Sequence, residues 1–293
     1  MLKNLGGLYA ALITPFHENG EVNYEQIQNV VEFLIQKGID GFYVCGSTGE
    51  AFLLTMEERK KILETVIAKN RGRVSVIAHV GNIGTDLSVE LGKHAKAAGA
   101  DAISSVTPFY YKFSEKEIIN YYYALADRTQ MPTIVYNFPS LTGFALSIKD
   151  VDELAKNPNI VGIKHTSLDL YALERFKKAH PRLTVFNGHD EVLLYGLIAG
   201  ADGGIGSTYN FMPHKFRKLR QFVLQGKIKE AQNVQHEIND VIDYVSKYGA
   251  MRVAKEFLRD WGFDCGNCRA PFTPLTDAEK AELKTVFIKK VRE

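Results

Sequence analysis

The feature that most constrains the fold is a regular alternation of short β-branched or aromatic runs with longer segments of helical period. It repeats about eight times along a chain of 293 residues. Alternating strands and helices with no long all-strand block predict parallel pairing through right-handed crossovers. We therefore expect an α/β protein with a closed (β/α)8 TIM barrel, and an open doubly wound sheet is the structural alternative.

The expected strands are residues 8–14, 41–45, 74–80, 102–106, 133–137, 160–165, 184–187 and 203–207. The expected helices between them are residues 24–37, 56–69, 87–98, 115–128, 148–156, 170–179 and 192–199. Capping residues support two of the helix starts, because Thr55 precedes Glu57 and Glu58, and Ser114 with Glu117 has the spacing of a capping box. Glycines mark several helix ends, at Gly38, Gly99 and Gly200.

Strand signals stop after about residue 212, and only helical period remains. The later helices are expected at residues 215–225, 227–248, 252–261 and 277–291. We interpret residues 1–225 as the barrel and residues 226–293 as a C-terminal helical extension packed on it.

Charge and cysteine content indicate the kind of partner and the compartment. The 36 Lys and Arg against 34 Asp and Glu leave a net charge of +2, with no basic stripe that would favour nucleic acid. Three cysteines, an odd number, fit a reducing compartment better than a disulfide framework. The start, Met1 to Gly7, lacks the apolar core of a secretory signal. These features predict a cytoplasmic protein that acts on a small molecule.

One uncharged stretch, residues 129–148, is about as long as a membrane-spanning helix. Pro132, Pro139 and Gly143 interrupt it, which favours a buried strand, a turn and the start of a helix. No membrane association is expected.

In a barrel of this type the active site forms at the carboxyl ends of the strands. Polar residues gather at those ends here, in residues 46–50, 107–111, 136–137, 164–166, 188–191 and 206–208. The sequence therefore predicts a single polar mouth.

Lys164 is the strongest single signal, because it lies in an expected strand directly after the apolar run of residues 160–163. Strand alternation places Gly162, Lys164 and Thr166 on one face, and Val161 and Ile163 on the face that packs on helices. A lysine held inside the barrel loses hydration, so a neutral amine becomes available to form a Schiff base with a carbonyl. The structural alternative is a lysine that extends to the barrel mouth or pairs with an acid.

Tyr136 ends the strand before the one that carries Lys164, so the two side chains are expected to be neighbours. A phenol beside such a lysine can transfer protons, although a tyrosine in this position is more often a packing residue.

Four further segments carry weaker signals. Residues 46–50 have glycines and hydroxyls that suit a carboxylate anion, and residues 203–207 contain glycines that either contact a ligand or relieve crowding. Asp190 and Glu191 fit sugar hydroxyls or a helix start, while a glycosidase carboxylate pair is disfavoured because adjacent residues point apart. Cys265 and Cys268 form one lone pair, too few ligands for zinc, and are interpreted as structural or incidental.

Taken together, these motifs resemble the pyruvate-dependent class I aldolase superfamily, which includes N-acetylneuraminate lyases and dihydrodipicolinate synthases. The similarity runs from about Gly7 to Pro274. The motifs that carry it are residues 43–52, 106–111, 136–137, 164–167, 188–191 and 201–210, and they are most similar to the lyase branch.

The resemblance implies roles for individual residues. Lys164 would form the Schiff base, Tyr136 would move protons, and Ser47 and Thr48 would hold the substrate carboxylate, with Ser47 also in the proton relay. Tyr110 would reach the site of a neighbouring subunit, which implies a homotetramer built from tight dimers. Residues matching positions that bind sugar hydroxyls are Thr166, Gly188, Asp190, Glu191, Gly206 and Ser207.

The implied function is reversible cleavage of N-acetylneuraminate, in sialic acid catabolism, with no metal and no cofactor. Leu141 and His165 stand where synthases usually carry an arginine and an acid, which favours a lyase. Cys45, Leu168 and Met251 depart from the usual pattern and bear on fine specificity. The alternatives are an aldolase for another 2-keto-3-deoxy sugar acid, dihydrodipicolinate synthase, or a non-catalytic keto-acid sensor.

Overall fold

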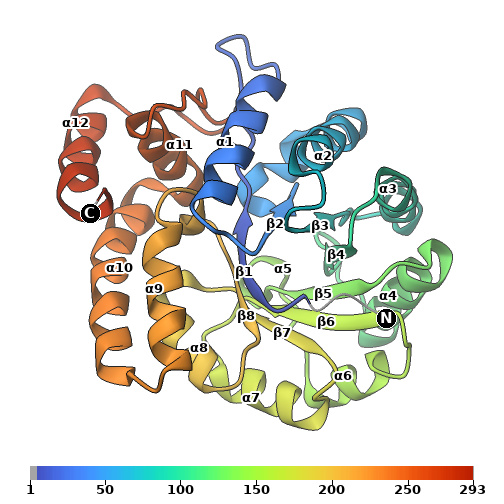
Figure 1. Cartoon of the computed structure of the whole chain (residues 1–293). Helices are drawn as coiled ribbons and strands as arrows, with labels where there is room; N and C mark the ends of the chain where they lie inside the picture. Colours follow the sequence, from blue (N-terminus) through green and yellow to red (C-terminus); the bar gives the residue numbers. More distant parts are fainter. Residues whose placement is uncertain (1–4, 293) are drawn as a thin grey trace. The chain divides into compact units, whose positions relative to one another are not determined.

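The computed structural model describes residues 5–292 and contains eight strands that follow one another in chain order in a closed barrel (Figure 1). Neighbouring strands pair in parallel. The strands are β1 (Gly7–Ala11), β2 (Gly41–Val44), β3 (Ser75–His79), β4 (Ala102–Val106), β5 (Thr133–Asn137), β6 (Ile160–His165), β7 (Thr184–Asn187) and β8 (Gly203–Gly206). The (β/α)8 prediction is confirmed, and the open sheet is excluded.

The helices confirm the predicted alternation, with small differences at their ends. They are α1 (Tyr24–Gln36), α2 (Met56–Asn70), α3 (Thr85–Ala98), α4 (Glu115–Thr129), α5 (Pro139–Thr142), α6 (Ile148–Leu154), α7 (Leu170–Ala179), α8 (Leu193–Ile198), α9 (Pro213–Leu224), α10 (Ile228–Tyr248), α11 (Ala250–Asp260) and α12 (Asp277–Val286). A π-helical turn, Phe287–Val291, follows α12. The sequence analysis missed α5, because a single turn is too short to show a helical period.

Local capping chemistry explains where helices begin and end. The predicted capping box of Ser114 with Glu117 is present, and Thr55, predicted to start a helix, forms a capping box with Glu58. Gly38, Gly99 and Gly200 all have positive φ, the conformation that glycine adopts at little cost. These signals were readable in the sequence because each involves residues within one helical turn.

The chain divides into two compact units. One contains Ser75–Ile205, and the other contains Leu8–Val74 and the residues from Gly206 onward. The predicted division at residues 225 and 226 stays a prediction; in the structure, α9 ends at Leu224 and α10 begins at Ile228.

In the unit that contains Ser75–Ile205, helices α4, α6 and α7 run along strands β5 and β6 (Figure 1). Ile160 and Ile163 of β6 are buried in one apolar cluster with Tyr122 of α4 and Phe176 of α7. Because strand side chains alternate, this contact directs Ile163 toward the helices and Lys164 toward the opposite face of the sheet.

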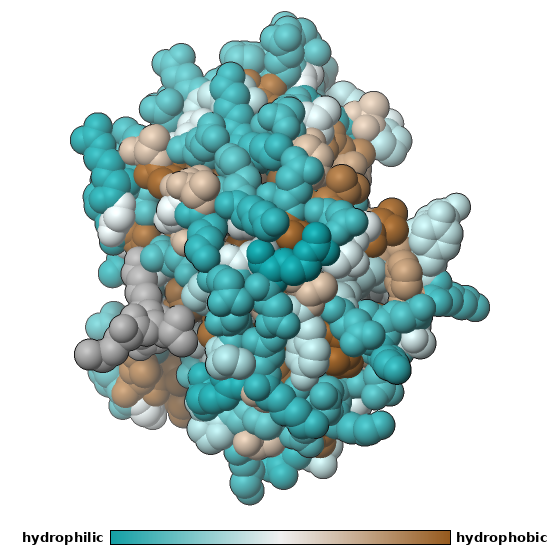
Figure 2. Space-filling view, turned by 90° about the vertical axis from the view of Figure 1, so that its right-hand side faces the viewer, coloured by the Kyte–Doolittle hydropathy of each residue, from teal (hydrophilic) through white to brown (hydrophobic). Residues whose placement is uncertain are grey.

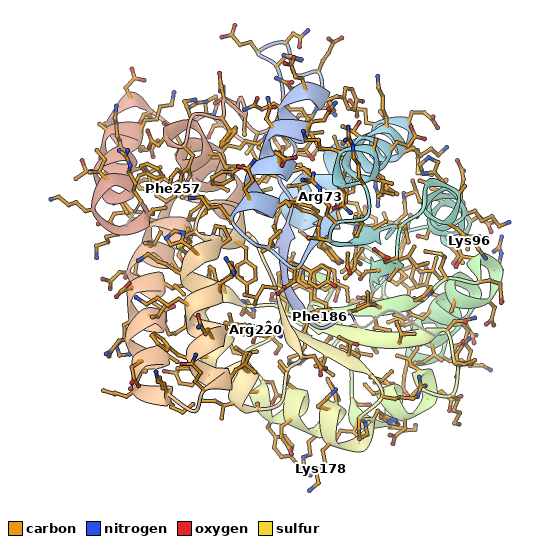
Figure 3. All side chains as sticks on the ribbon, viewed as in Figure 1. Arg73, Lys96, Lys178, Phe186, Arg220 and Phe257 are labelled. Atoms are coloured by element: carbon orange, nitrogen blue, oxygen red, sulfur yellow. The ribbon has the colours of Figure 1, made fainter. Side chains whose placement is uncertain are left out.

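In the second unit, aromatic side chains join the C-terminal helices. Phe257 of α11 is fully buried, and its ring lies 4.9 Å from that of Phe211 and 5.9 Å from that of Phe287 (Figure 3). Trp261 donates its indole N–H to the Phe211 carbonyl at 2.9 Å. Its ring also lies 5.3 Å from that of Phe287, so Trp261 is a packing residue of this aromatic group.

Residues 129–148 contain the end of α4, then β5, α5 and the start of α6. The predicted buried strand and helix start are confirmed, and α5 lies where a turn was predicted. Within residues 5–292, no helix has the length and apolarity needed to cross a membrane. Figure 2 shows a face on which hydrophilic side chains predominate and apolar ones are scattered. Part of the segment on which the signal-peptide expectation rested, residues 1–4, lies outside the described residues.

Candidate active site

Lys164 lies in β6 with 4% of its surface exposed. In register it stands beside Tyr136 of β5 on one side and Phe186 of β7 on the other. Its Nζ lies 4.0 Å from the centroid of the Tyr136 ring. The predicted neighbourhood of Lys164 and Tyr136 is confirmed.

Phe186 was not identified from the sequence. It is fully buried on β7, and Figure 3 labels it in the interior beside β6. Residues that pair in register on adjacent strands point to the same face, so Phe186 and Tyr136 flank the lysine amine. Strand alternation on β7 together with the pairing register could have revealed it, but the register is a long-range property.

Two aromatic rings hold Tyr136, which is itself 2% exposed. Phe138 stacks on it with centroids 5.6 Å apart, and the edge of His79 approaches it at 6.2 Å. The Tyr136 ring is thus fixed by contacts with His79 of β3, with Phe138 after β5 and with Lys164.

His165, next to the lysine, is a structural residue on the outer face. Asn137 Nδ2 donates to its Nδ1 at 3.0 Å, and its Nε2–H donates to the Asp169 carbonyl at 2.9 Å. Burial lowers the pKa of His165, which favours the neutral ring that this hydrogen-bond pattern requires. His165 therefore joins the ends of β5 and β6 immediately beside Tyr136 and Lys164.

Thr166 follows β6 on the same face as Lys164, and it is 5% exposed. Its Oγ1 is buried and has no hydrogen-bond partner among the described residues. A Cβ on Gly188 would lie only 1.9 Å from that oxygen, so only glycine fits at position 188. An unsatisfied buried hydroxyl costs free energy, which is consistent with a hydroxyl reserved for a ligand.

Asp190 and Glu191 lie in a 3-10 turn, Asp190–Val192, immediately before α8. Asp190 is 6% exposed, whereas the Glu191 side chain is 39% exposed and its Oε1 lies 2.9 Å from His189 Nδ1. Burial raises the pKa of Glu191, but the hydrogen bonds from His189 and the backbone outweigh it, and the net shift is downward. The two acids face different surroundings, as expected for adjacent residues.

Tyr110 lies apart from this buried group. Its side chain is 84% exposed, its φ is +75°, and its ring contacts the Tyr111 ring at 5.0 Å. An exposed tyrosine in the left-handed region is unusual.

Ser47 and Thr48 belong to the second unit, in a 3-10 turn, Ser47–Gly49. A Cβ on Gly49 would lie 2.9 Å from the Leu12 carbonyl oxygen, and the Gly49 carbonyl accepts a hydrogen bond from Thr14 at 2.7 Å. The turn is thus held closely against the residues after β1.

Glu50, which ends this turn, forms an ion pair that the sequence analysis missed. Its Oε1 lies 2.7 Å from Lys255 Nζ of α11, and the two side chains are 0% and 2% exposed. Glu50 Oε2 also accepts the Arg269 backbone N–H at 2.8 Å. No local signal identifies this pair, because 205 residues separate its members.

Gly206 ends β8, and Ser207 precedes a 3-10 turn, Thr208–Asn210. The Asn210 side chain donates to the carbonyls of Ala11 and Ser207 at 2.7 and 2.8 Å. A Cβ on Gly203 would lie 1.8 Å from the Gly7 carbonyl oxygen, so this glycine relieves crowding. From the sequence, relief of crowding and contact with a ligand were equally open explanations for the glycines in residues 203–207.

All three cysteines are free, and Cys45 and Cys265 are buried. Burial raises the pKa of Cys45 to about 11 and that of Cys265 to about 12, so both remain thiols at neutral pH. Burial of an unreactive thiol is consistent with the interpretation of Cys265 as a structural or incidental residue.

Similarity to known proteins identifies the family in which this buried lysine and tyrosine occur. The sequence pattern of the Dihydrodipicolinate synthetase family matches residues 4–290. The chain belongs to this family. The superfamily resemblance is thereby confirmed over nearly the full length.

Among relatives, the N-acetylneuraminate lyase of Citrobacter koseri is 42% identical over 98% of this chain and 97% of its own. The structure of CdNal from Clostridium difficile in complex with mannosamine has a TM-score of 0.96 and 37% identity, covering 98% of this chain and all of that one. A sialic acid aldolase of Ruminococcus gnavus, solved as a catalytic lysine mutant, has a TM-score of 0.95 and 32% identity, with 99% of both chains covered.

Proposed function

We propose that this family member is a carbon–carbon lyase, a class I aldolase, that reversibly cleaves N-acetylneuraminate to N-acetylmannosamine and pyruvate. The observation that carries the proposal is the buried amine of Lys164, which stands between Tyr136 and Phe186. The relatives named as N-acetylneuraminate lyases and sialic acid aldolases support the choice of substrate.

The proposed reaction begins when the neutral Lys164 amine attacks the C2 ketone of the open-chain sugar acid and water leaves. The resulting iminium accepts the electron pair of the C3–C4 bond as the C4 hydroxyl loses its proton through Tyr136. This releases N-acetylmannosamine as an aldehyde and leaves an enamine. Protonation at C3 and addition of water then free pyruvate and regenerate the amine.

The other residues that the sequence analysis singled out have binding roles in this proposal. Ser47 and Thr48 hold the substrate carboxylate, and Ser47 takes part in the proton relay. The hydroxyl chain is held by Thr166, Gly188, Asp190, Glu191, Gly206 and Ser207. The unpaired, buried Oγ1 of Thr166 supports its role, because a substrate hydroxyl would satisfy it.

We also propose a homotetramer of tight dimers in which Tyr110 contributes to the site of the partner subunit. The high exposure of its ring and its left-handed backbone support this role. Sedimentation velocity would test the assembly; a monomer at micromolar concentration with full activity would contradict it. Three free cysteines support a cytoplasmic location. The proposed cleavage of N-acetylneuraminate gives the protein a role in sialic acid catabolism, part of carbohydrate metabolism.

The family's name keeps dihydrodipicolinate synthase as a second candidate. Leu141, which stands where synthases usually carry an arginine, is 65% exposed in α5 and supplies no cation for a second carboxylate. Rates with N-acetylneuraminate, with shorter 2-keto-3-deoxy acids and with aspartate semialdehyde plus pyruvate would separate the lyase from its alternatives.

Borohydride reduction in the presence of pyruvate, followed by peptide mass spectrometry, tests the central step. We expect a mass increase on the peptide that contains Lys164. The Lys164→Ala variant should show neither this mass increase nor cleavage activity. Lys178→Ala, on the outer side of α7, is the matched control and should retain both (Figure 3). Labelling on any other lysine would overturn the site, and binding of keto acids without turnover would indicate a sensor.

A further inference from the structure

We propose that His189 is a positioning residue that orients the Glu191 carboxylate toward the hydroxylated end of the sugar acid, and so sets specificity for long substrates. The inference rests on the proposed function and adds a residue to it that has no assigned role. Every contact used below lies within the unit that contains Ser75–Ile205.

The first observation is a direct hydrogen bond between the two side chains. His189 Nδ1 lies 2.9 Å from Glu191 Oε1, and the side chains are 25% and 39% exposed. Because an ionised carboxylate can only accept, His189 donates through Nδ1–H. The net lowering of the Glu191 pKa is consistent with a carboxylate that is held in its charged form.

The second observation is that two hydrogen bonds hold the backbone carbonyl of His189. The Asn187 side chain, which is 1% exposed, donates to the His189 carbonyl at 2.6 Å, and the Val192 N–H donates to the same oxygen at 3.3 Å. The histidine therefore projects from a fixed backbone at the end of β7.

The third observation links this histidine to the reacting lysine through aromatic contacts. The edge of the His189 ring meets the Phe138 ring at 6.3 Å and 90°, and Phe138 stacks on Tyr136. The Tyr136 ring in turn lies under Lys164 Nζ. The carboxylate of Glu191 is thus held at a defined place relative to the amine that would bind the ketone end.

These contacts predict that Schiff-base formation and binding of the sugar end depend on different residues. The Schiff base depends on Lys164 and Tyr136, whereas His189 acts only through Glu191 on the far end of the substrate. Loss of the Nδ1–H donor should remove one of the hydrogen bonds that hold the Glu191 carboxylate, which weakens binding of hydroxylated substrates and spares the chemistry of the short ketone.

The experiment compares His189→Phe, which keeps a ring against Phe138 but removes the donor, with His189→Asn, which keeps an N–H donor. For His189→Phe we expect the KM for N-acetylneuraminate to rise about ten-fold, the size typical for loss of one charged hydrogen bond. The kcat should fall less than three-fold. His189→Asn should recover most of the KM.

Pyruvate trapping with borohydride and cleavage of a short 2-keto-3-deoxy acid serve as internal controls and should not change in His189→Phe. In a Glu191→Gln background, His189→Phe should have little further effect on KM, because the two residues act as one unit. An unchanged KM in His189→Phe, or additive effects in the double variant, would overturn the inference.

A parallel loss of pyruvate trapping in His189→Phe would also overturn it, since that result would show a general structural role. The wild-type protein separates this failure from that of the proposed function. If wild type forms the pyruvate adduct and cleaves N-acetylneuraminate while the variant behaves identically, only the role of His189 is wrong. If wild type does neither, the proposed function is wrong and the role of His189 is lost with it.

Discussion

At the scale of single residues, the site is defined by what surrounds the Lys164 amine. Tyr136 and Phe186 flank it in register, and His79 and Phe138 hold the tyrosine ring. The phenol is therefore restrained on several sides, and the only polar group it offers the reaction is its hydroxyl. This arrangement separates the roles of ring and hydroxyl, which a single substitution can test.

Tyr136→Phe keeps the ring stack and removes the hydroxyl. We expect kcat for cleavage of N-acetylneuraminate to fall by about 10²–10⁴, because a positioned general acid–base group contributes that factor. Steady-state kinetics measures kcat, and borohydride trapping with pyruvate should still label Lys164. Phe138→Leu is the control for disturbed packing and should lower kcat far less. An active Tyr136→Phe enzyme would assign the proton transfer to another group.

His214 gives a pH prediction at the same scale. Burial, reinforced by nearby lysines, lowers the pKa of His214 to about 4, from an ordinary value of 6.5. Between these values the unfolded chain binds a proton that the folded chain does not, so the free energy of unfolding falls as pH falls through that window. The contribution of His214 to the free energy of unfolding is therefore fully present above about pH 6.5.

Urea unfolding at pH 7 and pH 4.5 checks this expectation. His214→Gln should lose less stability than wild type between these pH values, because the titrating group is gone. His236→Gln removes an exposed imidazole from α10 and should follow the wild-type slope. Equal slopes for wild type and His214→Gln would show that other groups cause the loss.

At the scale of elements, strands and helices were predictable because their signals are local. A strand alternates its side chains, and a capping box lies within one turn, so β4 to β7 and the start of α2 needed no tertiary information. Short elements such as α5 were missed for the same reason, since one turn carries no period. The best test of a local signal is a helix cap.

Thr55→Ala removes the hydroxyl that accepts the Glu58 N–H at 3.1 Å at the start of α2. We expect the free energy of unfolding to fall by about 1 kcal/mol, the usual cost of a lost N-cap. Chemical denaturation measures it. Thr65→Ala, inside the same helix, removes an exposed hydroxyl that bonds only the Lys61 carbonyl and should change stability little. Equal effects of the two changes would exclude capping as the cause.

At the scale of the whole molecule, the largest feature that the sequence did not reveal is the ion pair of Glu50 and Lys255. It joins the turn after β2 to α11, and neither side chain is exposed beyond 2%. Lys255 resembles an ordinary helical lysine in the sequence, and its burial appears only when α11 packs against that turn. Removing one partner of such a pair leaves a buried, unpaired charge.

Lys255→Met should lower the free energy of unfolding by about 3–5 kcal/mol, the cost of breaking a buried ion pair. Lys247→Met is the matched control, because Lys247 pairs with Glu282 at 3.1 Å where the side chains are 55% and 40% exposed. Its loss should cost less than about 1 kcal/mol. Urea unfolding measures both, and similar losses would contradict the role of burial.

The sequence by itself determined the order of the strands and of the longer helices, the face on which Lys164 lies and the residue types available at the strand ends. Those properties follow from periods and caps that involve residues close together along the chain. Tertiary structure alone decided that Phe186 flanks Lys164, that His165 bonds to Asn137, and that Glu50 pairs with Lys255. These contacts depend on strand register and helix packing, which join residues distant in the chain and leave no local pattern.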